Sequence, residues 1–85
     1  MLEIFKTLGP TYLYAYADDI AISLFSEKMR KKLSKKSAEG RGGWYDNKVI
    51  TIDELKAMLH EHVEKGDMVD VANIAMMIAC REAMQ

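Results

Sequence analysis

Residues 51–77 read TIDELKAMLHEHVEKGDMVDVANIAMM, a stretch that predicts two consecutive helices. Thr51 and Glu54 have the spacing of a capping box, in which both side chains bind free backbone amides at a helix start. Gly66 can end this helix, because glycine adopts the left-handed backbone conformation without steric cost. Asp67 is a good N-cap for the next helix. The expected helices span 51–65 and 68–84.

A longer helix is expected upstream, over residues 11–36. Its apolar positions recur at steps of four, three and four, the spacing that lines one face of a helix: Leu13, Ala17, Ile20 and Leu24. Residues 37–50 interrupt this pattern with three glycines around Arg41 and predict a loop. The expected fold class is therefore all-α, a small bundle of three to four helices in a single domain over 1–85.

Length and composition bound the class of protein. The chain has 85 residues, 49% of them hydrophobic and 29% charged, which is an ordinary globular balance. No apolar run approaches the roughly 18 residues that span a bilayer, and no signal peptide is recognisable, so we expect no membrane partner. The single cysteine, Cys80, cannot form an internal disulfide and fits a reducing compartment. We expect a cytoplasmic protein.

The last expected helix is apolar around nearly its whole circumference. A helix of this kind is buried on all sides, and so short a chain offers few elements to cover it. We therefore predict a homo-oligomer that is held together through residues 68–84. The alternative is a central helix that the other helices surround in a monomer.

Charge is distributed unevenly along the chain. Residues 28–41 contain seven basic side chains and one acidic one, a net charge of +6, whereas residues 46–85 contain eight acidic and four basic ones, a net charge of −4. This asymmetry suits a ligand that carries phosphates and needs a divalent cation. The alternative is a solvated helix face. Nucleic acid is the least favoured partner, because the overall charge is −1 and the acidic half would repel a long polyanion.

Four carboxylates follow one another at a constant step of three: Glu61, Glu64, Asp67 and Asp70. Residues three apart lie on the same side of a helix, and the turn at Gly66 could fold the two pairs together. A hard divalent ion such as Mg²⁺ would neutralise them, because it takes oxygen ligands and substrate phosphates. Asn73 falls on the same side as Asp70 and could add a ligand. The alternative is that these residues cap helices and face solvent.

The glycine-rich loop carries the other candidate side chains. It lacks the lysine followed by Ser or Thr of a Walker phosphate loop, but Arg41 could clamp an anion. Trp44 could stack on a base, or plug the loop against the helices. His60 and His62 do not have the spacing of an H-E-x-x-H zinc site.

The chain resembles a known family over residues 32–77. The motif Gly-Arg-Gly-Gly-Trp-Tyr-Asp at 40–46 and the segment Asp-Val-Ala-Asn-Ile-Ala-Met-Met at 70–77 are similar to small phage-encoded MazG-like nucleotide pyrophosphohydrolases. That family is all-α and oligomeric, and releases pyrophosphate from nucleoside triphosphates with Mg²⁺ held by paired acidic motifs. Met58 stands where one acidic residue of the first pair is expected, and the connection between the acidic helices is shorter than in the family.

The resemblance implies a Mg²⁺-dependent nucleotide-binding protein that hydrolyses (deoxy)nucleoside triphosphates to monophosphate and pyrophosphate. It implies catalytic roles for Glu61 and Asp70. The expected metal ligands are Glu61, Glu64, Asp67 and Asp70. The expected substrate-binding residues are Lys32, Lys35, Lys36, Arg41, Trp44 and Asn73. The alternative is a non-catalytic phage accessory protein in the host cytoplasm that sequesters a nucleotide signal or inhibits a host protein.

Overall fold

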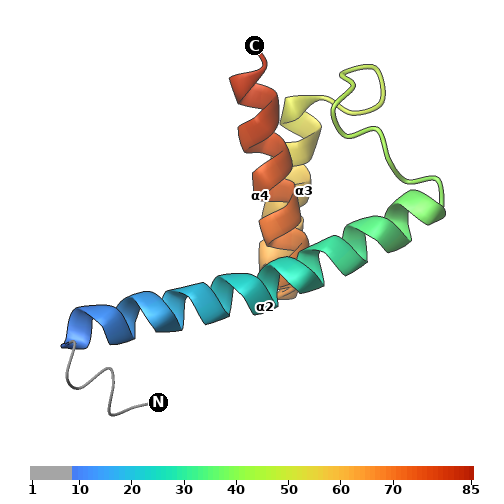
Figure 1. The fold of residues 1–85 in the computed structure, drawn as a ribbon. Helices are drawn as coiled ribbons and strands as arrows, with labels where there is room; N and C mark the ends of the chain where they lie inside the picture. Colours follow the sequence, from blue (N-terminus) through green and yellow to red (C-terminus); the bar gives the residue numbers. More distant parts are fainter. Residues whose placement is uncertain (1–8) are drawn as a thin grey trace.

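The computed structural model describes residues 9–85, which form three α-helices and no strand (Figure 1). The helices are α2 (Pro10–Ala38), α3 (Ile52–Lys65) and α4 (Met68–Ala83). The all-α class predicted from the sequence is confirmed. The first eight residues of the expected domain lie outside the described residues. Within the described part of the chain, none of the helices combines the length and apolarity needed to cross a bilayer.

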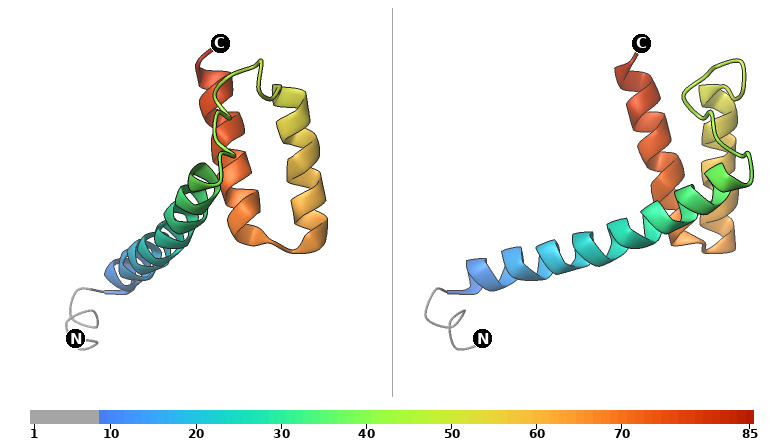
Figure 2. Two further views of the ribbon diagram at one scale, coloured as in Figure 1. Left: turned by 90° about the vertical axis from the view of Figure 1, so that its right-hand side faces the viewer. Right: turned by 45° about the vertical axis from the view of Figure 1, so that its right-hand side comes forward.

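The helices α3 and α4 form an antiparallel hairpin whose ends are set by local signals (Figure 2). The backbone N–H of Glu54 donates to Thr51 Oγ1 at 3.1 Å, and the N–H of Thr51 donates to Glu54 Oε1 at 3.2 Å, so the capping box is confirmed. Gly66 ends α3 with φ of +74°, in the left-handed region. The Asp67 carboxylate caps α4 by accepting the N–H of Asp70 at 3.3 Å.

The hydrophobic core is small and lies between α3 and α4. Its buried members are Leu55, Ile74 and Ile78, and partly buried apolar side chains pack around them. Near the end of α3, His62 is half-buried and the neighbouring Val63 is exposed. The inner side of α4 is half polar, since it also carries three buried polar residues: Asp70, Asn73 and Arg81.

The outer side of α4 is exposed and carries Ala75, Ala79 and Cys80. The helix is therefore covered on one side by the other described elements, and not on all sides. The outer side consists of small residues, and its burial by another subunit stays a prediction.

The long helix α2 crosses the hairpin near its turn and packs against α4 (Figures 1 and 2). Its 29 residues make it about 44 Å long, roughly twice the length of α3 or α4. The contacts with α4 come from its C-terminal half, and the N-terminal half extends away from the hairpin in all three views. No residue of α2 is buried.

Candidate functional site

Two lysines of α2 meet two aspartates at the start of α4. Lys32 Nζ lies 2.8 Å from Asp67 Oδ2 and 2.9 Å from Asp70 Oδ2, and Lys36 Nζ lies 2.9 Å from Asp70 Oδ1. We call these four residues the Lys–Asp cluster. They come from positions 34 to 38 residues apart in the chain, and their contacts join α2 to the hairpin.

Asp70 is the most buried member of the cluster, with 4% of its surface exposed. Burial alone would raise the pKa of Asp70, but the hydrogen bonds from Lys32 and Lys36 outweigh it and hold the pKa of this carboxyl well below its usual range. The hydrogen bonds to Asp67 and Asp70 in turn raise the pKa of Lys32. Both shifts favour the charged forms, so Lys32 and Asp70 stabilise each other as an ion pair.

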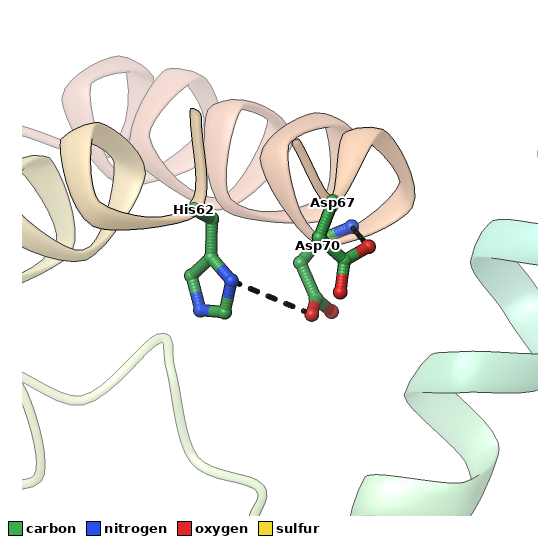
Figure 3. A group of neighbouring side chains, drawn as sticks. All are labelled: His62, Asp67 and Asp70. Atoms are coloured by element: carbon green, nitrogen blue, oxygen red, sulfur yellow. Dashed lines mark hydrogen bonds and ion pairs between the residues drawn. The ribbon is translucent and has the colours of Figure 1, made fainter. Parts of the chain in front are cut away.

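His62 of α3 adjoins the same carboxylates (Figure 3). Its Nδ1 lies 3.5 Å from Asp70 Oδ2, is buried, and has no hydrogen-bond partner among the described residues. One ligand atom from each of His62, Asp67 and Asp70 lies within 4.8 Å of the others, so the three could hold a metal ion. Carboxylate oxygens suit Mg²⁺ or Mn²⁺, and an imidazole also suits Zn²⁺. Lys32 binds both carboxylates and Lys36 binds Asp70, so a cation would compete with these ammonium groups for the carboxylates.

A cavity of about 340 Å³ opens beside the cluster, between the C-terminal end of α2, the hairpin and the loop of residues 39–51. This is within the range of small-molecule sites, about 300–1,000 Å³. Its polar lining includes Lys36, Arg41, Trp44 and Asn73, and its apolar lining includes Met58 and Met77. Lys36 belongs to both the cavity lining and the cluster, so the two adjoin.

Asn73 lines the cavity and also carries an unsatisfied acceptor. Its side chain is almost completely buried, with 1% of the residue exposed, and its Nδ2 donates to the carbonyl of Met29 at 3.3 Å. Its Oδ1 is buried and has no hydrogen-bond partner in residues 9–85. A buried carbonyl without a donor is costly, so a bound molecule with an N–H or O–H group at this point would gain a hydrogen bond.

The loop wall of the cavity is held by Arg81, which the sequence analysis did not single out. Arg81 is 5% exposed, and its guanidinium donates to the carbonyls of Trp44 at 2.9 Å and Ile50 at 2.8 Å, and to Asn47 Oδ1 at 3.0 Å. The signal available in the sequence is its position, seven residues after Ile74 on the same helix face. These contacts place Trp44 in the cavity wall, with the Tyr45 ring edge-on to it at 5.9 Å.

The other predicted site residues lie outside the cluster. Glu61 is exposed and pairs with Lys65 at 3.2 Å on the outer side of α3, and Glu64 is exposed. The inner face of α3 runs through His62, and residues one and two positions away point about 100° and 200° from it. Lys35 is exposed, and Arg41 pairs with Glu39. Among the four predicted metal ligands, the structure thus brings together Asp67 and Asp70.

Comparison with known proteins adds no relative: no protein-family model, curated protein or solved structure matches this chain.

Proposed function

We propose that the chain is a nucleotide-binding protein that takes a nucleoside triphosphate with Mg²⁺ and hydrolyses it to the monophosphate and pyrophosphate, in the cytoplasm. One observation carries this proposal: the cavity joins an aromatic ring, a buried amide and two cationic side chains to a pair of aspartates. Trp44 would stack on the base, Asn73 would accept a hydrogen bond, and Lys36 and Arg41 would bind phosphates.

The metal would be held by Asp67 and Asp70, with His62 as a further donor. When bound, Mg²⁺ would neutralise phosphate charge and activate the attacking water. The two lysines and two aspartates of the Lys–Asp cluster favour joint binding of a metal and a phosphate chain. The metal ion would replace the lysines at the carboxylates, and the phosphates would then bind the lysines. Glu61 and Glu64 would contribute only if α3 turned its outer side towards the cluster.

Calorimetry and pyrophosphate release with a panel of nucleoside and deoxynucleoside triphosphates would test this function. We expect Asp70→Asn and Asn73→Ala to weaken binding by about tenfold or more, since the first loses a charged metal ligand and the second a hydrogen bond in a buried site. Glu82→Gln removes an exposed carboxylate of α4 and serves as the matched control. The proposal is wrong if no nucleotide binds at millimolar concentration, or if the control loses as much affinity as Asp70→Asn.

A second candidate is a non-catalytic accessory protein that sequesters a nucleotide signal or inhibits a host protein. It is favoured by the Lys–Asp cluster, in which Asp70 is neutralised without a metal, and by the ion pair of Glu61 with Lys65 outside the site. Stoichiometric nucleotide binding without turnover would support sequestration.

The family resemblance also leads us to propose a homo-oligomer through residues 68–84. The surface available for it is the exposed small-residue side of α4. Small side chains allow close approach of helices, but they supply little apolar area. A charged substitution at Ala79 should dissociate such an oligomer.

A further inference from the structure

The N-terminal half of α2 exposes an apolar stripe that no described element covers. The stripe consists of Leu13, Ala17, Ile20 and Leu24, all of them exposed, with 40%, 41% and 59% of the surface accessible for Leu13, Ile20 and Leu24. We call these four residues the α2 seam. Other apolar residues of this half, Ile22 among them, are exposed too, but the four seam residues share one face, and contiguous apolar patches mark interaction surfaces.

The seam lies on the side of α2 that is turned away from the hairpin. At 100° per residue, the centre of the seam is about 130–150° from Met29 and Lys36, which mark the side that packs on α4. A partner on the seam would therefore leave the Lys–Asp cluster and the cavity accessible. The segment from Pro10 to Ser26 contains only two charged residues, Asp18 and Asp19, and both point about 130° from the seam.

The spacing of the seam identifies the kind of partner. Steps of four, three and four are the a and d spacing of a coiled coil, and this order of steps is the same when read backwards. In an antiparallel pair of identical helices, Leu13 of one copy would face Leu24 of the other, and Ala17 would face Ile20. The leucines of the two copies then pack against each other, and the small Ala17 lies opposite the larger Ile20.

We propose that a second copy of this chain binds the α2 seam, in an antiparallel, two-fold symmetric dimer. The same patch on both copies is self-complementary, as a two-fold interface requires. The seam is 12 residues long, about 18 Å along the helix, and we expect a small interface, below about 1,200 Å² in total. Dimerisation is therefore expected to depend on protein concentration. This inference does not rest on nucleotide binding.

Sedimentation of matched variants tests the seam. Ile20→Glu places a charge in the interface, whereas Ile22→Glu makes the same change at a residue that is 65% exposed and lies on the opposite side of α2. Neither residue is buried, so circular dichroism should show both variants folded. We expect the wild type to sediment at twice the 9.7 kDa chain mass at high concentration. Ile20→Glu should raise the dimer dissociation constant by about tenfold or more, because the charge would be desolvated.

Disulfide trapping in a Cys80→Ser background tests the antiparallel register. The doubly substituted chain with Leu13→Cys and Leu24→Cys should form a covalent dimer on oxidation, and the chain with Leu13→Cys alone should not. A wild type that stays monomeric overturns the proposal, as does equal weakening by Ile20→Glu and Ile22→Glu. Cross-linking by Leu13→Cys alone would indicate a parallel pair and would also overturn it. An oligomer that Ala79→Glu dissociates and Ile20→Glu does not would assign the interface to α4.

Discussion

Replacement of Arg81 by methionine should destabilise the protein and release the loop of residues 39–51. The guanidinium makes three hydrogen bonds of 2.8–3.0 Å to this loop, and the residue is 5% exposed. Methionine keeps the aliphatic stem, so the change removes mainly the charged donors. Hydrogen bonds that involve a charged group contribute about 1.5–3 kcal/mol each.

The loss should be smaller than the sum of three such bonds, because Trp44 and Ile50 are only half-buried and Asn47 is exposed. Water can replace part of the hydrogen bonding that the guanidinium supplied. We therefore expect the free energy of unfolding to fall by about 2–4 kcal/mol. A chain of this size has roughly 4–13 kcal/mol in total, so the variant should be marginally stable.

Urea unfolding followed by circular dichroism measures the change in free energy. The fluorescence of Trp44, the single tryptophan, reports on the loop in the native state. We expect its emission to move to longer wavelength in Arg81→Met, because the ring gains contact with water. Arg81→Lys keeps one charged donor and should fall between the two proteins, and Glu82→Ala changes an exposed neighbour as a control. A loss below about 0.5 kcal/mol together with unchanged emission would refute the role of Arg81, since surface substitutions have effects of this size.

Two further predictions follow from the hairpin and the cluster. Gly66→Ala should lower the free energy of unfolding in urea by about 1 kcal/mol. The surrounding space is open, but φ of +74° is unfavourable for a residue with a Cβ atom. An unchanged urea midpoint would show that the turn can relax. The low pKa of Asp70 means that its contribution to stability is complete above the ordinary aspartate pKa of about 3.9 and is lost as the pH falls further. The difference in unfolding free energy between wild type and Asp70→Asn should therefore be large at neutral pH and shrink in acid, and a difference that stays constant would contradict the ion pairs.

The local features of the fold could be predicted from the sequence because short-range interactions set them. The capping box at Thr51, the left-handed Gly66 and the N-cap at Asp67 each depend on residues within four positions. The helices at Pro10–Ala38, Ile52–Lys65 and Met68–Ala83 lie within two residues of the ranges that the sequence predicts.

The long-range pairings of the site could not be predicted in this way. Lys36 and Asp70 are 34 residues apart, and nothing in either segment specifies their contact. The constant step of three also groups Glu61 with Asp70, but the turn at Gly66 changes the helix direction between them. At this end of α3 the residue that faces inward is His62, one position away from Glu61. Hydropathy likewise missed Arg81, because a buried cation looks like a solvent-facing one until its acceptors in the loop are known.

The position of α4 in the chain has a consequence for biosynthesis. Both α2 and the 39–51 loop find their tertiary partners on α4, which is the last of the three helices to be translated. At about 5–20 residues per second, Lys32 and Lys36 precede Asp70 by roughly 2–8 s. During that interval α2 lacks the surface of α4 against which it packs. Emergence of α4 from the ribosome is therefore the event that converts separate helices into a domain.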